Sequence, residues 1–231
     1  NGKHITHREE WKPTLFVPSK RKTKYKTLEG ESVEPIQPGF VRDCREFYKK
    51  YDEVENFKIY GNDRYVYQYI SEKYPEEHIQ FDIKKIRLVT IDIEVAAESG
   101  FPDVENVAEE LLLISLQDYA TKKVTTFGSR PFDNKDPNVN YIYCQNETIL
   151  LTSFLSYWRK NLPEVITGWN SQMYDIPYLA GRINRILGEK SMKDLSPWGL
   201  VSQDEVYISG RRNITYDIGG VTQLDYLDLY K

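Results

Sequence analysis

IRLVTIDIEV, residues 86–95, is the stretch of sequence that decides the fold. Branched aliphatic residues alternate with other side chains along it, which is typical of a β-strand. Because successive side chains of a strand point to opposite faces, Asp92 and Glu94 share one face and lie about 7 Å apart. The opposite face carries an apolar stripe, formed by Val89, Ile91, Ile93 and Val95. The pattern therefore predicts a core strand that carries two carboxylates.

Two unpaired anions on a buried strand are energetically costly, so we expect either cations or a metal ion to neutralise them. Lys84, Lys85 and Arg87 are the nearest basic residues, and only Lys84 has the same strand parity as the two acids. The alternative is a strand that ends in solvent and leaves both acids hydrated.

Composition places the chain among ordinary soluble globular proteins, with 40% hydrophobic and 29% charged residues in a length of 231. No apolar run is long enough for a membrane span, and the first residues lack the apolar core of a signal peptide, so we expect a cytoplasmic protein without membrane contact. The net charge of −4 argues against a protein that coats nucleic acid through a global positive field. Cys44 and Cys144 have neither disulfide nor zinc spacing.

Residues 1–80 predict a small mixed α/β module in which strands accompany one helix at 40–51, and DRYVYQYIS at 63–71 alternates like a strand. The basic run KRKTKYK at 20–26 could contact phosphates, and a solvated loop is the alternative.

Residues 81–231 predict a second domain. After 86–95, strands at 111–119 and 122–128 make an antiparallel meander, and 139–144 is a candidate short strand. A helix is expected at 147–162, where Asn146 is the N-cap and one face is apolar through Leu151, Phe154, Leu155 and Trp158.

A buried strand at 164–170 and a helix at 175–188 follow, with Pro177 in the first turn and Gly188 past the end. The last part reads as a hairpin with loops at Gly210 and Gly219-Gly220, ending in a strand. The order of elements predicts an α/β (mixed α+β) architecture with a mixed sheet flanked by helices.

A further acid lies in GWNSQMYDIPYL, residues 168–179, which places Asn170 and Asp175 between a strand and a helix start. Loops at such places commonly aim side chains into a cleft. Taken alone, Asp175 reads as a helix N-cap. Capping does not exclude metal binding, and three converging acids predict a site for a hard cation such as Mg²⁺ or Mn²⁺.

These residues carry a family resemblance. DIE at 92–94 and N-x3-Y-D at 170–175 resemble the first two motifs of the 3′–5′ proofreading exonuclease of family B DNA polymerases, which has a ribonuclease-H-like fold. KIRLVTIDIEV, ESGFP, VITGWNSQMYDIPYLAGRINRILGE and LDYLDLYK follow the order of the replicative polymerases of T-even-like tailed phages. The resemblance covers 81–231 well. It covers 1–80 more weakly, through WKPTLFVP and ENFKIYGNDRYVYQYI.

The resemblance implies hydrolysis of the 3′-terminal phosphodiester of single-stranded DNA by two divalent cations, Mg²⁺ or Mn²⁺. It implies that Asp92 bridges both ions, that Glu94 helps to hold the ion that activates water, and that Asp175 holds the second ion. Asn170 would lie beside the terminal nucleotide. Phe101 would pack against its base, since stacking on an aromatic ring tolerates any base; the alternative for Phe101 is a core residue that anchors the turn.

One family motif, Tyr-x3-Asp on a later helix, is not found in the last part of this sequence. Asp225 and Asp228 lack its spacing, and we expect them to be solvated or to cap a turn. We therefore expect a fragment whose exonuclease domain, 81–231, stops before the third motif, with weak or absent nuclease activity and no polymerase activity, although the parent would be an active enzyme.

In the parent, the resemblance implies primer-template DNA, a sliding clamp and other replication proteins as partners, in the cytoplasm of an infected host, and we expect the fragment to be monomeric. Two alternatives stay open. One is a non-catalytic nucleic-acid-binding scaffold with the same fold, and the other is a stand-alone 3′–5′ exonuclease.

Overall fold

The computed structural model describes residues 5, 7–55, 57–75, 78, 81–97, 100–208 and 210–230. The chain divides into two compact units. Residues 7–80 form one unit, and residues 81–231 form the other together with the first six residues. Each unit is described by itself.

The smaller unit contains three strands and two helices: β1 (Leu15–Pro18), β2 (Tyr25–Lys26), β3 (Ser32–Ile36), α1 (Val41–Tyr51) and α2 (Tyr65–Lys73). The strands form an antiparallel sheet in the order β1-β3-β2. The basic run at 20–26 lies in and before β2, and its five cationic side chains are exposed, as those of a solvated loop would be.

Helix α2 corrects the expectation of a strand at 63–71. The residues that contact the rest of the unit recur at helical spacing rather than on alternate positions. Tyr69 packs edge-on against Trp11 at 5.6 Å between ring centroids, and Glu72 accepts the Trp11 indole N–H at 2.9 Å. One turn earlier, Tyr65 is buried. Tertiary contacts of the tyrosines outweigh the local alternation.

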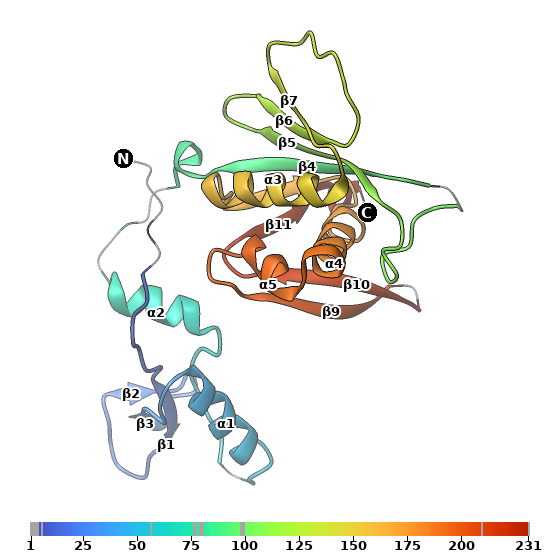
Figure 1. Ribbon diagram of the computed structural model, residues 1–231. Coiled ribbons are helices and arrows are strands. Elements are labelled where there is room, and N and C mark those ends of the chain that lie inside the picture. Colours follow the sequence, from blue (N-terminus) through green and yellow to red (C-terminus); the bar gives the residue numbers. More distant parts are fainter. Residues whose placement is uncertain are drawn as a thin grey trace. The chain divides into compact units, whose positions relative to one another are not determined.

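The larger unit is built on a six-stranded mixed sheet with the order β11-β8-β4-β5-β6-β7 (Figure 1). Its strands are β4 (Leu88–Val95), β5 (Leu111–Asp118), β6 (Val124–Gly128), β7 (Val139–Tyr143), β8 (Val165–Gly168) and β11 (Thr222–Asp225). β4, β5 and β6 form the expected antiparallel meander. β7, β8 and β11 join it through parallel pairing, β7 to β6, β8 to β4 and β11 to β8.

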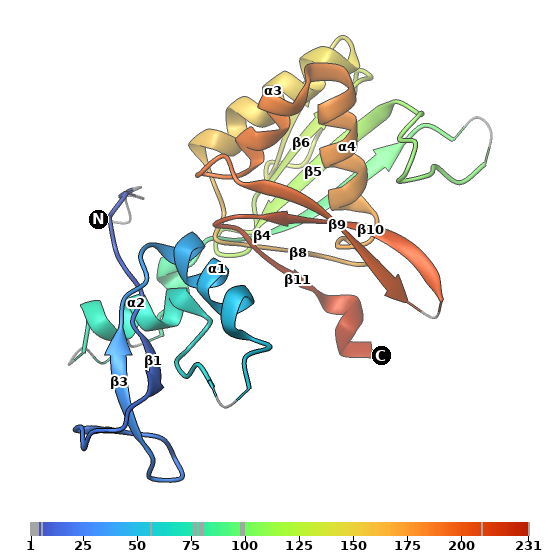
Figure 2. The same ribbon diagram turned by 90° about the horizontal axis from the view of Figure 1, so that it is seen from below.

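Helices α3 (Glu147–Lys160) and α4 (Asp175–Leu187) cover one face of this sheet (Figures 1 and 2). The remaining elements are the short helix α5 (Glu189–Met192), the antiparallel hairpin of β9 (Val201–Ile208) and β10 (Arg211–Ile218), and three 3₁₀ turns, η1 (Ile83–Lys85), η2 (Lys193–Leu195) and η3 (Tyr226–Tyr230). The mixed α/β fold with a helix-flanked mixed sheet, typical of a ribonuclease-H-like exonuclease domain, is confirmed.

One local expectation is corrected at the C-terminal end. The expected hairpin is that of β9 and β10, and the turn at Gly219-Gly220 leads to β11, which pairs with β8. The final strand ends at Asp225 and gives way to η3; Lys231, the last residue expected in that strand, lies outside the described residues.

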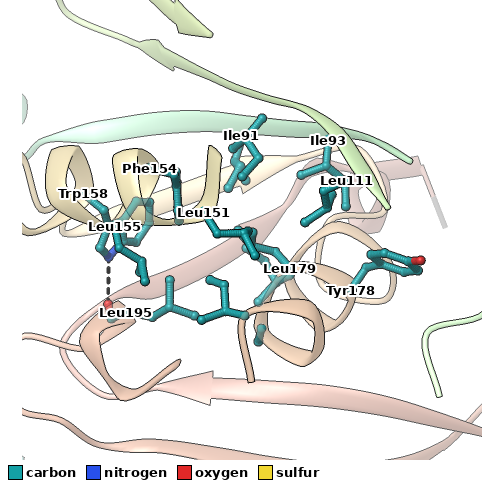
Figure 3. Close-up of a cluster of buried hydrophobic side chains, with 14 of the residues drawn as sticks. Ile91, Ile93, Leu111, Leu151, Phe154, Leu155, Trp158, Tyr178, Leu179 and Leu195 are labelled. Carbon is teal, nitrogen blue, oxygen red and sulfur yellow. Dashed lines mark hydrogen bonds between the residues drawn. The ribbon is translucent and has the colours of Figure 1, made fainter. Parts of the chain in front are cut away.

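The core lies between the sheet and the two helices. Ile91 and Ile93 of β4 face α3 and α4, where Leu151, Phe154 and Leu155 are at most 4% exposed (Figure 3). The buried Trp158 donates its indole N–H to the carbonyl of Leu195 at 2.9 Å. As expected, the side chain of Asn146 caps α3 by accepting the N–H of Ile149.

A buried ion pair fastens α4 to the rest of the unit. Arg182 of α4 donates to both carboxylate oxygens of Glu147 at 2.5 and 2.6 Å, and both residues are 7% exposed. Glu147 also accepts the N–H of Leu111 at 2.9 Å, and Arg182 donates to the carbonyls of Val107 and Ala108. The helix that carries Asp175 is thus fixed relative to β5, the neighbour of β4.

Candidate acidic cation site

Asp92 and Glu94 lie on the sheet face opposite to the helices. The alternation along β4 is the expected one: Ile91 and Ile93 are buried, and the two acids are exposed. Across the meander Asp92 pairs in register with Ser115, and Glu94 with Leu113. Because both acids are exposed, the burial penalty that the sequence suggested does not apply to them.

Basic side chains do not neutralise this pair. Lys84 and Lys85 belong to the turn η1 and not to the strand, so strand parity does not apply to Lys84. Arg87 instead approaches Asp118, with 3.4 Å between Nε and Oδ2. Among the described residues, neither Asp92 nor Glu94 has an ion-pair partner.

Asp175 is the one of the three acids whose ionised form is disfavoured by burial. It is the first residue of α4 and is only 5% exposed, and its Oδ1 accepts the backbone N–H of Ile93 at 3.0 Å. β8 pairs with β4 only along residues 88–90, so the edge of β4 is open beyond that point and Asp175 occupies it. Its carboxyl group therefore lies against the backbone between Asp92 and Glu94.

Burial and the negative charges of neighbouring acids change the pKa of the Asp175 carboxyl group. The pKa of Asp175 is raised to about 6, chiefly by burial; the hydrogen bond from the Ile93 N–H opposes this rise, and the negative charges of Asp92 and Asp225 add to it. Burial also raises the pKa of Tyr174 to about 12, with contributions from Tyr178, Asp175 and Glu94. These shared fields show that the acids of β4 and of α4 occupy one electrostatic neighbourhood.

The carboxylate oxygens of Asp92, Glu94 and Asp175 are donor atoms of the type that a hard divalent cation prefers. Mg²⁺ and Mn²⁺ prefer oxygen ligands, and a cation would relieve the repulsion that disfavours ionised Asp175. Within the described part of the chain, no three acidic, histidine or cysteine side chains are already arranged at metal-ligand geometry. The Asp175 carboxyl thus lies against the strand that carries Asp92 and Glu94, without a preformed cage among the described residues.

The loop between β8 and α4 turns sharply at Asn170. Its backbone has φ of 59°, in the left-handed region, and its carbonyl accepts the N–H groups of Met173 and Tyr174. Within the described residues, the side-chain amide of Asn170 has no hydrogen-bond partner. It is thus available to a ligand.

Phe101 is not a core residue, since it is 84% exposed. Its ring lies 5.0 Å from that of Tyr174, centroid to centroid, and Tyr174 immediately precedes Asp175. An exposed aromatic ring therefore stands beside the acidic neighbourhood.

Asp225 caps the turn η3, as expected, because it directly precedes Tyr226 and its carboxylate accepts the N–H of Leu227 at 3.0 Å. The same carboxylate also accepts the backbone N–H groups of Asn170 and Gln172 at 2.9 and 3.1 Å, and the sequence did not predict these contacts. Asp228 lies in η3.

The fold and the acidic neighbourhood define an α/β domain of the ribonuclease-H-like exonuclease class. The family model for the exonuclease domain of DNA polymerase family B matches residues 48–231. This chain therefore belongs to that family.

Individual relatives agree with this assignment. The DNA-directed DNA polymerase of Enterobacteria phage T4 is 31% identical over 257 residues, and that of Escherichia phage RB69 is 30% identical over 260 residues. Each alignment covers 100% of this chain and 28% of the phage protein. The DNA polymerase catalytic subunit of Elephantid herpesvirus 1 is 33% identical over 44% of this chain and 10% of its own length.

Proposed function

We propose that this chain supplies 3′–5′ exonuclease chemistry to a replicative DNA polymerase, by removing the 3′-terminal nucleotide of single-stranded DNA. The observation that carries the proposal is the contact of Asp175 with Ile93, since it brings a third, buried carboxyl group against the strand that carries Asp92 and Glu94. Family membership supports the same reaction.

Asp92, Glu94 and Asp175 would hold divalent cations, Mg²⁺ or Mn²⁺, two in number. Bound in a pair, such ions activate a water molecule and stabilise the leaving 3′ oxygen. Asp92, exposed on β4, would contact both ions, Glu94 would hold one, and Asp175 would hold the other. Ionised Asp175 is required for this, so cation binding should release its proton.

Asn170 and Phe101 would orient the substrate. The unpartnered amide of Asn170 can donate to and accept from the terminal nucleotide, and the exposed ring of Phe101 can stack on its base. Both lie on segments that adjoin an acid of the site, Asn170 in the loop before Asp175 and Phe101 after β4.

The same proposal covers the domains, the partners and the cellular location of the reaction. Residues 1–80 would be the N-terminal domain and residues 81–231 the exonuclease domain of a polymerase that acts on primer-template DNA with a sliding clamp and other replication proteins. No described helix combines the length and apolar character needed to cross a bilayer. We place the reaction in the cytoplasm of an infected host cell, expect the chain itself to be monomeric, and expect its own nuclease activity to be weak.

Two other functions compete with this one. A scaffold that binds nucleic acid without chemistry would keep the fold and would not need metal ions. A stand-alone exonuclease would need the ions but not the unit of residues 7–80, and the alignments with the phage polymerases include that unit. Metal-dependent hydrolysis separates the first alternative from the proposal.

Two measurements on the same chain test the proposal: Mn²⁺ binding followed by electron paramagnetic resonance, and degradation of a 3′-mismatched single strand in Mn²⁺. We expect wild type to bind Mn²⁺ and to shorten the strand slowly from its 3′ end. Asp92→Ala should abolish both. Asp133→Ala, which removes a carboxylate that is 88% exposed in the loop between β6 and β7, should change neither. Mn²⁺ binding that survives Asp92→Ala would show that the site is wrongly assigned, and binding without any degradation would favour the scaffold.

A further inference from the structure

The carboxylate of Asp225 holds the loop that carries Asn170. Asp225 is the last residue of β11 and pairs in register with Gly168, the last residue of β8. Its Oδ1 accepts the Asn170 N–H at 2.9 Å and its Oδ2 accepts the Gln172 N–H at 3.1 Å. The two carboxylate oxygens thus bind backbone N–H groups two residues apart in the loop between β8 and α4.

The loop is constrained from its inner side as well. A Cβ atom on Gly168 would lie 2.7 Å from the Cβ of Ser171 and 2.8 Å from the carbonyl oxygen of Ile91, so the chain folds back tightly over the end of β8. Ser171 is only 5% exposed. Asn170 takes the left-handed conformation in this turn, which asparagine adopts more readily than most residues other than glycine.

Asp225 is poorly suited to bind a cation. An ionised carboxylate offers about four acceptor positions. Three are used by the N–H groups of Asn170, Gln172 and Leu227, and these backbone donors cannot move aside without opening the loop. A carboxylate whose acceptor positions are occupied in this way fixes the orientation of the backbone N–H groups that it binds.

We infer that Asp225 is a positioning residue for the single-stranded substrate, which acts through Asn170 by fixing the turn that presents the Asn170 amide beside the acids. The inference rests on the proposed function and adds a residue to it. It follows that loss of Asp225 should weaken binding of the DNA strand while leaving cation binding by Asp92, Glu94 and Asp175 in place.

A double-mutant cycle tests this coupling. Binding of a short 5′-labelled single strand is measured by fluorescence anisotropy in Ca²⁺, which limits hydrolysis, for wild type, Asp225→Asn, Asn170→Gly and the double variant. Glycine accepts the left-handed backbone at position 170 and removes only the amide side chain. We expect each single variant to weaken binding about tenfold, as loss of a hydrogen bond would, and the double variant to be no weaker than Asn170→Gly alone.

Cation binding separates positioning from a general loss of structure. Mn²⁺ affinity should change less than about twofold in Asp225→Asn, because the metal-binding acids are untouched. The matched control is Asp118→Asn, which removes another carboxylate that accepts a turn N–H, that of Thr121, at the far end of β5. It should leave DNA binding unchanged. If Asp225→Asn does not fold, Asp225→Glu, which keeps the charge and displaces the oxygens by one methylene, replaces it in the cycle.

The outcomes are distinct. If wild type binds the DNA strand and the losses of affinity in the two single variants multiply in the double variant, Asp225 and Asn170 act independently. This result would overturn the role of Asp225 and leave the proposed function standing. An unchanged affinity in Asp225→Asn would do the same. Failure of wild type to bind the strand, or Mn²⁺ binding that does not need Asp92, would overturn the proposed function and with it this inference.

Discussion

The side chain of Asp175 accepts the backbone N–H of Ile93 at 3.0 Å, so that the first residue of α4 is joined to the strand residue that separates Asp92 from Glu94. This contact places a buried acid where a neighbouring strand would otherwise continue. It also makes the site a source of instability that depends on pH and on cations, from which the following expectations derive.

Replacing Asp175 by asparagine should stabilise the chain at high pH in the absence of metal. The pKa of Asp175 in the folded chain is about 6, against 3.8 for an ordinary aspartate, so folding favours its protonated form. The corresponding stability is present at low pH and is lost as the pH rises through about 6. At about 1.4 kcal/mol per pKa unit, Asp175→Asn should gain about 2 kcal/mol in the free energy of unfolding at about pH 8 relative to about pH 4.5. Urea titrations in a chelator provide the measurement.

The opposite sign is expected for Asp118. Burial raises the pKa of Asp118, but hydrogen bonds from Thr121 and the charge of Arg87 outweigh this and lower it overall. Its stabilising effect is therefore present at neutral pH and lost as the pH falls through its folded-state pKa. Asp118→Asn should lower the stability at about pH 8 more than at low pH. If both variants responded to pH in the same direction, the electrostatic account of Asp175 would be wrong.

Mn²⁺ should stabilise the wild-type chain, and more so above pH 6 than below it. A ligand that binds only the folded state at about 100 times its dissociation constant adds about 2.7 kcal/mol. Near pH 5, Asp175 must first lose its proton, so a smaller shift in melting temperature is expected. The check is differential scanning calorimetry with and without Mn²⁺. An equal shift in Asp92→Ala would mean that the stabilising ion binds elsewhere.

Phe154→Ala should strongly destabilise the larger unit. Phe154 is fully buried and lies 6.1 Å from the ring of Phe127 and 5.5 Å from that of Trp158. Removing such a ring from a packed core typically costs about 3–5 kcal/mol. Phe132→Ala removes the same side chain at a position that is 63% exposed and should change stability by less than about 0.5 kcal/mol. Chemical denaturation of both variants compares them directly.

Breaking the Glu147–Arg182 pair from one side should be worse than replacing both partners. Glu147→Leu leaves the guanidinium of Arg182 buried without its carboxylate, for which we expect a loss of about 3–5 kcal/mol. The double variant Glu147→Leu, Arg182→Met should recover part of that loss, because no charge is then left unpaired. The exposed pair Arg42–Glu46 gives the reference, since Glu46→Leu should cost at most about 1 kcal/mol. A double variant no more stable than the single one would contradict this account.

Most of the larger unit could be read from local pattern. The alternation in 86–95 gave β4 with the correct face for each side chain, because burial on one face of a strand leaves a strong two-residue period. The apolar spacing from Leu151 to Trp158 gave α3 for the corresponding reason, and Asn146 marked its start. Local pattern also made Asp92, Glu94 and Asp175 the candidate acids, and their role stays a prediction.

What could not be read from pattern depends on contacts between distant segments. The local sequence does not indicate that Asp225 accepts the N–H of Asn170, 55 positions earlier, or that Glu147 and Arg182 form an ion pair across 35 positions. For the same reason α2 was mistaken for a strand, since its Tyr69 packs against the distant Trp11. The position of Asp175 at the edge of β4 likewise depends on where β8 stops.

The length of β8 therefore decides whether this surface can be a site at all. β8 stops at Gly168, beside Ile91. Two more extended residues would carry it to Ile93, where its own carbonyl would take the N–H that Asp175 accepts, and the sheet would be sealed at this edge. A longer β8, with every acid retained, would thus displace the Asp175 carboxyl from this edge and remove the proposed site.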